Sequence, residues 1–245
     1  MRVLLSGASG VIGTALAGLV EQDEACSLAG VASRGAFFPP DVAGDVLIDF
    51  SHPTLTERSM ALADDLAIPT VIGTTGLTEA CLERIADAAQ RIPVCVAANF
   101  SIGVNLMLAL AARAARDLPD SFDIDIAEIH HRRKLDAPSG TALALGEAVA
   151  GACGAKWPDS AVMDRSGRRL PRPAGEIGLQ AVRGGDVAGE HTVYFLGDGE
   201  RLEITHRATD RSIFARGALL AAKKLLGRAP GRVDFQSLML ASDQS

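Results

Sequence analysis

Short apolar runs alternate with amphipathic stretches from Arg2 up to Ser101. Such runs are typical of buried strands, and apolar positions that recur every three or four residues are typical of helices. The expected strands are 2–5, 28–32, 46–50, 69–73 and 93–97. The expected helices are 14–21, part of 53–66, and a Thr78-capped helix through Ala89. This alternation predicts an α/β fold with a Rossmann-like, doubly wound parallel sheet, whose ligands bind at the carboxyl ends of the strands.

The pattern changes beyond Ser101. A long helix, apolar on one face and expected to end before Pro119, is followed by a polar-apolar alternation that starts at Asp123 and breaks at Ala127. Sequential strands without intervening helices then predict an α+β second domain with a mostly antiparallel sheet. These strands are expected at 177–182, 192–196 and 201–205.

Two further segments complete the pattern. Residues 155–175 are rich in Pro, Gly and Arg, and we expect them to form a loop. Ser212 is expected to cap a helix through Leu226, which Gly227 and the residues after it stop. This helix is apolar over so wide a face that it must be buried.

A glycine-rich turn follows the first strand. Gly7 permits a tight turn, Gly10 lets the backbone approach a pyrophosphate, and Gly13 allows the helix to pack closely on the strand. The spacing is Gly-x-x-Gly-x-x-Gly rather than the usual Gly-x-Gly-x-x-Gly, but the flanking strand and helix favour dinucleotide binding over a merely structural turn. The residues expected to contact the cofactor here are Gly7, Ala8, Ser9, Gly10, Val11 and Ile12.

Ser33 and Arg34 follow the second expected strand, at the point where this fold places the residue that reads the ribose. Asp23 and Glu24 come too early for that position and Asp41 comes too late, whereas Arg34 is placed to accept a 2'-phosphate. We therefore expect NADPH to be preferred and NADH to be used as well. The following connection, 35–44, is too short and too irregular for a crossover helix.

Composition and charge narrow the class of protein. The 245 residues are 48% hydrophobic, and the formal net charge of -6 argues against general nucleic-acid binding. The 4 cysteines form no C-x-x-C pair and lie in apolar segments, as is typical of reduced thiols. No apolar run forms a signal peptide or approaches the roughly 18 residues of a membrane span. We expect a globular, cytoplasmic protein that binds neither nucleic acid nor membrane.

The densest cluster of reactive side chains lies in residues 129–141. His130 and His131 precede three cations, and Ser139 is a good N-cap for a helix that begins near Gly140, with its amides turned toward the loop. An anion is the natural ligand of such a helix end. The alternative interpretation is a solvated basic loop. Adjacent histidines on a strand face opposite ways, so only one would enter a given pocket, and no Cys or carboxylate lies beside them at ligand spacing, so we expect no metal.

The run from His130 to Ala142, His-His-Arg-x-Lys-x-Asp-Ala-Pro-Ser-Gly-Thr-Ala, resembles the signature of the dihydrodipicolinate reductase family. The similarity extends over most of the chain from Asp45 to Gly217. Its other motifs are 73–76, 97–101, 189–192 and 204–206. Compared with the family, the connection at 35–44 looks shortened.

The resemblance implies NAD(P)H-dependent reduction of 4-hydroxy-tetrahydrodipicolinate or dihydrodipicolinate, a cyclic dicarboxylate of lysine and diaminopimelate biosynthesis, by a homotetramer. His130 would be the acid, Lys134 would hold a carboxylate, and His131 would be a secondary substrate contact. The other substrate carboxylate would be held by Ser139, Gly140 and Thr141. The nicotinamide side of the cofactor would be lined by Gly73, Thr74, Thr75, Ala97, Ala98, Asn99 and Phe100.

The resemblance also implies a discontinuous first domain. We expect 1–101 to bind the dinucleotide, 102–211 to bind substrate and form the oligomer, and 212–245 to return to the first domain. Two alternatives stay open. One is another two-domain amino-acid dehydrogenase, of the aspartate or homoserine type, and the other is a redox sensor that binds NADP without turning it over. His191 and His206 are interpreted as structural.

Overall fold

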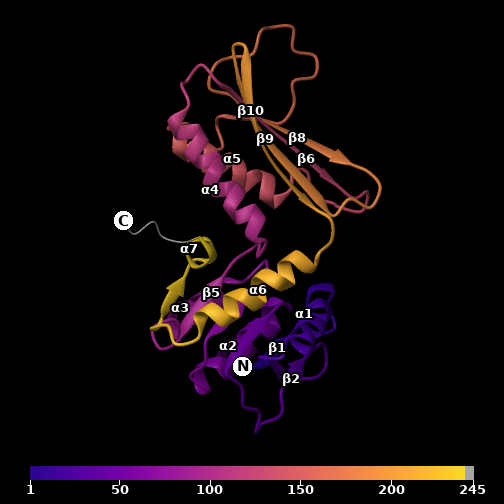
Figure 1. Ribbon diagram of the computed structural model, residues 1–245, viewed down its shortest axis with the longest axis vertical. Coiled ribbons are helices and arrows are strands. Elements are labelled where there is room, and N and C mark those ends of the chain that lie inside the picture. Colours follow the sequence, from indigo (N-terminus) through magenta and orange to yellow (C-terminus); the bar gives the residue numbers. More distant parts are fainter. Residues whose placement is uncertain (241–245) are drawn as a thin grey trace. The chain divides into compact units, whose positions relative to one another are not determined.

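The computed structural model of the protein describes residues 1–240, so the end of the expected returning segment, 241–245, lies outside the described residues. The chain forms two compact units (Figure 1). The first comprises Met1–Ile102 and the chain from Arg211 onward, and the second comprises Gly103–Asp210. Within residues 1–240, no helix combines the length and the apolar character needed to span a membrane.

The first unit is built on a six-stranded sheet in which every pairing is parallel. In spatial order its strands are β11 (Gly231–Val233), β5 (Pro93–Val96), β4 (Thr70–Ile72), β3 (Val46–Asp49), β1 (Arg2–Ser6) and β2 (Ser27–Ala32). The predicted doubly wound α/β sheet is confirmed. The sequence pattern did not predict β11, because this edge strand is short and follows a glycine- and proline-containing turn.

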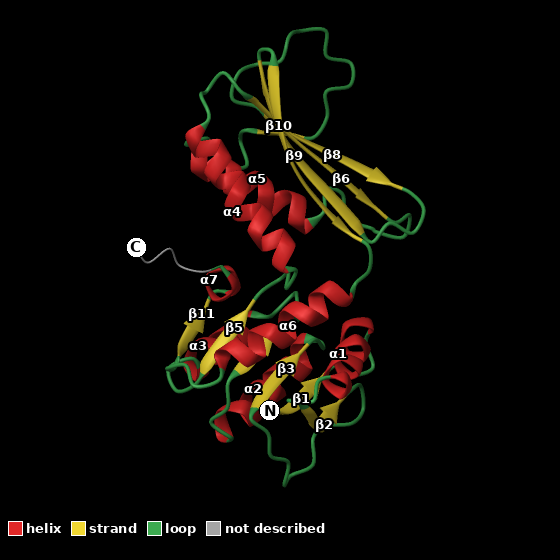
Figure 2. Cartoon of the chain, in the orientation of Figure 1, coloured by secondary structure: helices red, strands yellow, loops and turns green. Residues whose placement is uncertain are grey.

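Helices cover both faces of this sheet (Figure 2). The helices of this unit are α1 (Val11–Gln22), α2 (Pro53–Asp65), α3 (Glu79–Ala88), α6 (Ser212–Leu225) and α7 (Phe235–Met239). Val3 and Leu5 of β1 pack into a core with α1, α6 and α7, whereas Leu4 packs into a second core with α2 and α3. A strand buried on both faces needs apolar residues at consecutive positions, and for this reason β1 is a continuous apolar run.

Two sequence predictions concern the β2–β3 connection and the start of α6. The connection from β2 to β3 contains no helix, as predicted, and Phe38 from this connection is buried in the core beside α2 and α3. The expectation that Ser212 caps the last long helix is wrong. Arg211 occupies the cap position without a side-chain capping hydrogen bond, and Ser212 is the first helical residue, whose hydroxyl accepts a hydrogen bond from Arg216 at 3.2 Å.

The second unit packs α4 (Ile102–Asp117) and α5 (Gly140–Cys153) against a five-stranded sheet. In spatial order its strands are β10 (Glu200–Ala208), β9 (Gly189–Gly197), β6 (Asp123–His130), β8 (Ile177–Arg183) and β7 (Ala161–Val162). The predicted α+β class is confirmed. In detail the sheet is mixed: β9 pairs antiparallel with β10 and with β6, whereas β8 pairs parallel with β6 and with β7. The parallel pairing arises because the chain crosses over through α5 between β6 and β8.

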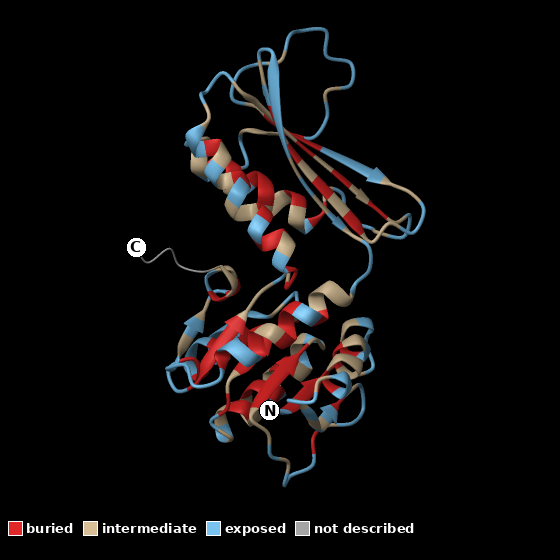
Figure 3. Ribbon diagram, viewed as in Figure 1, coloured by how far each residue is buried: buried red, intermediate tan, exposed pale blue. Residues whose placement is uncertain are grey.

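The alternation of polar and apolar residues breaks at Ala127, but β6 continues beyond it to His130. Polar residues occupy the core-facing positions at the end of this strand, so the alternation of polar and apolar residues is lost while the strand goes on. Figure 3 shows buried residues along the central strands of the first unit and on the inner faces of α4 and α5 in the second. Glu128 and His130 are among the buried residues of the second unit.

Candidate active site

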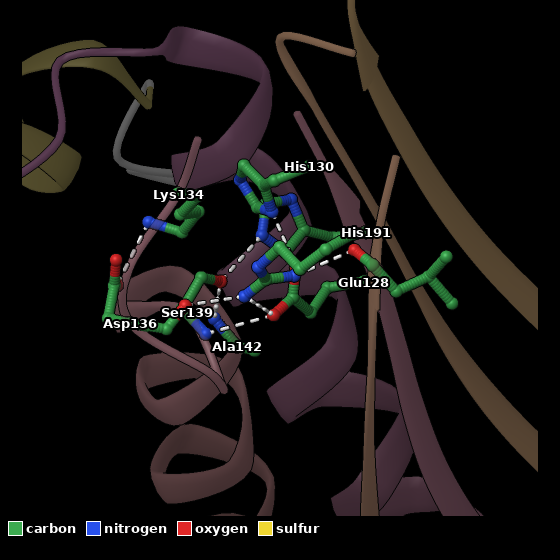
Figure 4. A network of polar contacts seen from close by, with 9 residues as sticks. Glu128, His130, Lys134, Asp136, Ser139, Ala142 and His191 are labelled. Atoms are coloured by element: carbon green, nitrogen blue, oxygen red, sulfur yellow. Dashed lines mark hydrogen bonds and ion pairs between the residues drawn. The ribbon is translucent and has the colours of Figure 1, made fainter. Parts of the chain in front are cut away.

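The reactive cluster of the second unit forms where β6 ends and α5 begins. His130 is the last residue of β6, and its Nδ1 lies 2.5 Å from Oε2 of Glu128 (Figure 4). The two residues are two positions apart on a strand, so their side chains project from the same face. This contact gives His130 a defined orientation inside the unit.

Arg183 completes the contacts of this carboxylate from the neighbouring strand. It is the register partner of His130 across β6 and β8, and its Nη1 and Nη2 lie 2.8 Å and 2.7 Å from Oε2 and Oε1 of Glu128. The backbone N–H of Ser139 donates to the same Oε1 at 3.0 Å. Burial raises the pKa of Glu128, but hydrogen bonds from Arg183, His130 and Ser139 outweigh it and lower that pKa below its ordinary value. The carboxyl group is therefore ionised at neutral pH.

Ser139 caps α5 as predicted, and it is also tied to the sheet. Its hydroxyl accepts from the backbone N–H of Ala142 at 3.2 Å and lies 3.1 Å from Nε2 of His191. His191 is the register partner of Glu128 on β9, and its ring lies 5.1 Å from the ring of His130. Burial, followed by the charge of His130, lowers the pKa of His191 to about 4, so its ring is neutral at neutral pH.

The loop between β6 and α5 carries the predicted cation. Lys134 Nζ lies 2.9 Å from Oδ2 of Asp136, whose side chain is 58% exposed. The carbonyl of Asp136 accepts from Arg183 Nη2 at 2.6 Å, so the same arginine holds the loop and Glu128. His131 is half-buried, and its backbone N–H donates to the carbonyl of Val187 at 2.8 Å.

The residues at the start of α5 and in the loop before it differ in how far they are exposed to solvent. Gly140 and the basic residues Arg132 and Arg133 are exposed, whereas Ser139 is buried. Thr141 is half-buried in the first turn of the helix. Because the amide and the hydroxyl of Ser139 are both engaged within the protein, the exposed end of the helix lies at Gly140.

In the first unit, a cavity of about 830 Å³ lies at the carboxyl end of β1. Of the predicted cofactor residues, Gly7, Ser9, Gly10 and Arg34 line it. Gly7 has a φ of +86°, and a Cβ there would lie 2.2 Å from the carbonyl oxygen of Phe50, so only glycine fits. Ala8 and Ile12 pack partly against the core of this unit, and Val11 is 66% exposed.

Other residues lining this cavity were missed by sequence reasoning. They are Ser33, Gly35, Ala36, Phe37, Phe50, Ser51, His52, Thr54, Leu55 and Arg58. The guanidinium of Arg58, on α2, lies 4.0 Å from the centre of the Phe37 ring. No local signal identifies Arg58, because its approach to Phe37 depends on how α2 packs beside the β2–β3 connection.

The turn after β4, expected on the nicotinamide side of the cofactor, is held by contacts with the turn after β3. Thr74, after β4, donates to Asp49 Oδ1 at 2.9 Å and accepts from the N–H of Ser51 at 2.8 Å, while Thr75 is exposed. Gly73 lies against the ring of Phe50, which a Cβ at position 73 would approach to 2.2 Å. These contacts give the turn after β4 a defined shape.

The turn after β5 combines buried and exposed positions. Phe100 is buried, and its ring packs 4.7 Å from that of Phe235, so it is a core residue. Asn99 accepts from the N–H of Ser101 at 2.8 Å, Ala97 packs against the same core, and Ala98 is exposed. In this turn, Ala98 therefore has the most accessible side chain.

Glu128 and Arg183 are the candidate site residues that sequence reasoning missed in the second unit. Glu128 carries a signal that could have identified it, because it precedes His130 by two residues on an expected strand and so shares its face. Arg183 carries no such signal, since its proximity depends on the register of β6 with β8.

Comparisons with known proteins agree with this architecture. The family model for "Dihydrodipicolinate reductase, N-terminus" matches residues 39–100, and the model for "Dihydrodipicolinate reductase, C-terminus" matches residues 103–239. The glycine-rich turn at Gly7 precedes both matched ranges. The two models together match well over half of the chain.

Relatives of known function match nearly the whole chain. A 4-hydroxy-tetrahydrodipicolinate reductase of Anaeromyxobacter sp. (strain Fw109-5) is 44% identical over 98% of this chain and 97% of its own. One of Akkermansia muciniphila is 45% identical over 240 residues, 98% of both chains, so it has nearly the same length as this chain. The solved structure of dipicolinate-bound dihydrodipicolinate reductase from Paenisporosarcina sp. TG-14 superposes with a TM-score of 0.77 at 24% identity, covering 96% of this chain and 97% of that one. It shares the fold.

Proposed function

The chain belongs to the dihydrodipicolinate reductase family, and from this premise we propose which of its residues perform the reaction. The protein is an NAD(P)H-dependent oxidoreductase that reduces 4-hydroxy-tetrahydrodipicolinate to tetrahydrodipicolinate in lysine and diaminopimelate biosynthesis. The hydroxyl group leaves as water, which gives a double bond conjugated with an imine, and the reduction adds a hydride and a proton across that double bond. The protein must therefore hold a dicarboxylate and deliver the proton.

The first unit is proposed as the dinucleotide-binding domain, with its cofactor in the cavity beside Gly7. Gly7 lies so close to the backbone of Phe50 that no side chain fits there, and the turn therefore presents only its backbone to a ligand. The helix α1 begins just after this turn, at Val11, and the amides of its first turn are available to a pyrophosphate. Arg34 lines the same cavity and supplies the charge for a 2'-phosphate, which favours NADPH. When bound, the dinucleotide supplies the hydride.

His130 is proposed as the residue that delivers the proton. The observation that carries this role is its short contact with a buried, ionised carboxylate directly beside the start of α5. An imidazole held in this way has one nitrogen engaged by the protein and the other left for a substrate. We assign a supporting contact to His131, which lies outside the strand in the adjoining loop.

Lys134 and the start of α5 are proposed to hold the two substrate carboxylates. The present partner of Lys134, Asp136, has a side chain that is 58% exposed, and an ion pair with a solvated carboxylate contributes little, so a substrate carboxylate can replace it. Gly140 and Thr141 lie in the first turn of α5, and the positive end of a helix dipole attracts an anion. Ser139 serves this end of the helix by capping it.

We also propose that the second unit forms a homotetramer through its sheet, in a cytoplasmic enzyme. Val193 and Phe195 of β9 face the helices, so the alternate residues Tyr194 and Leu196 face the opposite way. Leu196 is 37% exposed, and Val182 on β8 is 52% exposed. These exposed apolar side chains lie among polar ones such as Thr192 and Thr205, and a mixed sheet face of this kind supports burial between subunits.

An enzyme assay tests the assignment. The purified protein is mixed with NADPH and with substrate generated in place by the aldolase that precedes this step, and the loss of nicotinamide absorbance is followed. Aspartate semialdehyde, and oxaloacetate with ammonia, test the homoserine- and aspartate-dehydrogenase alternatives. Oxidation of NADPH with either of these and none with the cyclic substrate would contradict the proposal, and binding of NADPH without oxidation by any of them would favour the sensor.

A further inference from the structure

We propose that Glu128, held by Arg183, is the positioning residue of the proton transfer. Its carboxylate fixes the ring of His130 with a proton on Nδ1, so that Nε2 is the nitrogen that exchanges a proton with substrate. The same carboxylate sets the loop that leads into α5. This inference rests on the proposed role of His130 and names the atom through which that role is performed.

The first step is the arrangement of donors around the carboxylate. Oε2 faces His130 Nδ1 at 2.5 Å and Arg183 Nη1 at 2.8 Å, and Oε1 faces Arg183 Nη2 at 2.7 Å and the N–H of Ser139 at 3.0 Å. Glu128 is only 1% exposed. A carboxylate accepts at about four lone-pair sites, so these four contacts satisfy it within the protein. Glu128 is therefore in no position to contact substrate, and its effect passes through the groups it holds.

The second step is the tautomer of His130. An ionised carboxylate can only accept hydrogen bonds, and the contacts of Arg183 keep Glu128 ionised, so the Nδ1 that faces it must carry hydrogen. In a free imidazole the two nitrogens compete for that proton, and the hydrogen bond made by one determines the state of the other. Nε2 then alternates between a bare lone pair and N–H, as an acid that gives up and recovers a proton requires.

The third step is the space that this ring orientation requires. A Cβ on Gly189 would lie 2.9 Å from Nε2 of His130, closer than a real Cβ contact permits. Glycine at this position therefore leaves Nε2 unobstructed by a side chain from β9. The other ring facing His130 is that of His191, which is neutral at neutral pH because of its low pKa.

The fourth step connects the acid with the proposed carboxylate-binding end of α5. Glu128 accepts from the N–H of Ser139, and Arg183 donates to the carbonyl of Asp136, so one ion pair holds both ends of the segment 136–139. Disturbing this pair should therefore affect the acid and the anion site together. A residue that only stabilised the fold would lower the amount of active enzyme without changing its kinetic constants.

Nuclear magnetic resonance of the wild-type protein gives the direct test. With histidine labelled by ¹⁵N in both ring positions and His130→Gln used to assign the signals, the neutral ring of His130 should show a protonated Nδ1 and a bare Nε2. The protein is measured as it exists, without substrate, so the result does not depend on the catalytic role of His130. A neutral ring with its proton on Nε2 would overturn the proposal.

Kinetics of Glu128→Gln provide the second test. The turnover number should fall by about 10²-fold, within the range that a positioned general acid contributes, and the apparent substrate constant should rise as the α5 end is disturbed. Asp159→Asn is the matched control, because Asp159 pairs with Lys156 at 2.7 Å with both side chains exposed, and it should leave both constants unchanged. If Glu128→Gln folds and both kinetic constants match the wild type, Glu128 has no positioning role.

The role of His130 as the acid and the role of Glu128 as its positioning residue can be contradicted separately. The expected Nδ1 tautomer together with normal turnover in His130→Gln would contradict the proposed acid but not the orientation by Glu128. Loss of turnover in His130→Gln together with an Nε2-protonated ring would keep the acid and overturn the positioning. Arg183→Lys serves if Glu128→Gln does not fold, since it keeps the charge but loses the two-pronged contact, and it should lower turnover in the same direction.

Discussion

His130 and Arg183 are register partners on the adjacent parallel strands β6 and β8, and both contact the carboxylate of Glu128. The candidate acid is thereby joined to a cation that lies far from it in sequence. The pairing places a buried charge network at the end of a strand, where this second unit also begins α5. The arrangement of reactive side chains in the second unit therefore depends on the register of β6 with β8 as well as on the residues of the stretch 129–141.

The two adjacent histidines should differ in kinetics. His130→Gln should lower the turnover number by about 10²- to 10⁴-fold, the usual contribution of a positioned general acid, with little change in substrate binding. His131→Gln should have a smaller effect, mainly on the apparent substrate constant. Steady-state kinetics with thermal melts of each variant measure this. Normal turnover in His130→Gln with a large loss in His131→Gln would move the catalytic role to the neighbouring residue.

Lys134 should contribute to binding as well as to rate. Lys134→Ala should raise the apparent substrate constant about 10- to 100-fold, because a charge-assisted hydrogen bond contributes roughly 1.5–3 kcal/mol, and it should also slow turnover. Arg133→Ala is the matched control from the same loop. Arg133 is exposed, and its removal should change stability by no more than about 0.5 kcal/mol, with near-normal kinetics. If the two variants showed the same rise in the apparent substrate constant and the same fall in turnover, the effect would come from the overall charge of the loop and not from Lys134 in particular.

Arg34 should distinguish the two cofactors. Arg34→Ala should weaken the binding of NADPH about 10- to 100-fold and leave the binding of NADH nearly unchanged, because only NADPH carries the 2'-phosphate. The preference of the wild type for NADPH should also decrease with added salt. Titration with each cofactor measures this, with Arg113→Ala as a surface control from an exposed ion pair in the second unit. Equal weakening of both cofactors would mean that Arg34 does not read the phosphate.

His191 should make the stability of the protein depend on pH. Its pKa is about 4 in the folded protein and about 6.5 in an unfolded chain, so the unfolded state binds more protons between these values. The contribution of His191 is therefore complete above pH 6.5 and is lost as pH falls toward 4, by about 3 kcal/mol.

Urea unfolding of the wild type and of His191→Gln between pH 4 and pH 7 measures this contribution. Glutamine retains an amide that can bond the hydroxyl of Ser139, which contacts His191 in the wild type. The variant should be less sensitive to acid than the wild type over this interval. Identical pH dependence in the two proteins would mean that His191 is protonated equally well in the folded and unfolded states.

Much of the fold follows from local pattern. The runs at β1 and β3, the helix starts at Thr78 and Ser139 and the absence of a helix between β2 and β3 were predicted correctly. Periodicity and capping act over a few residues, so a sequence displays them directly. The cap assigned to Ser212 was wrong because here the serine is the first helical residue, and only the course of the backbone distinguishes this position from the cap.

The sequence by itself determined the doubly wound sheet, the glycine turn at Gly7 and the histidine-lysine motif that identifies the family. Only the tertiary structure decided that Glu128 lies between His130 and Arg183 and that Arg58 reaches Phe37. The reason is physical. Periodicity, caps and turns are encoded within a few residues, whereas strand register and helix packing are set by contacts between distant segments, whose free energy does not appear in any local pattern.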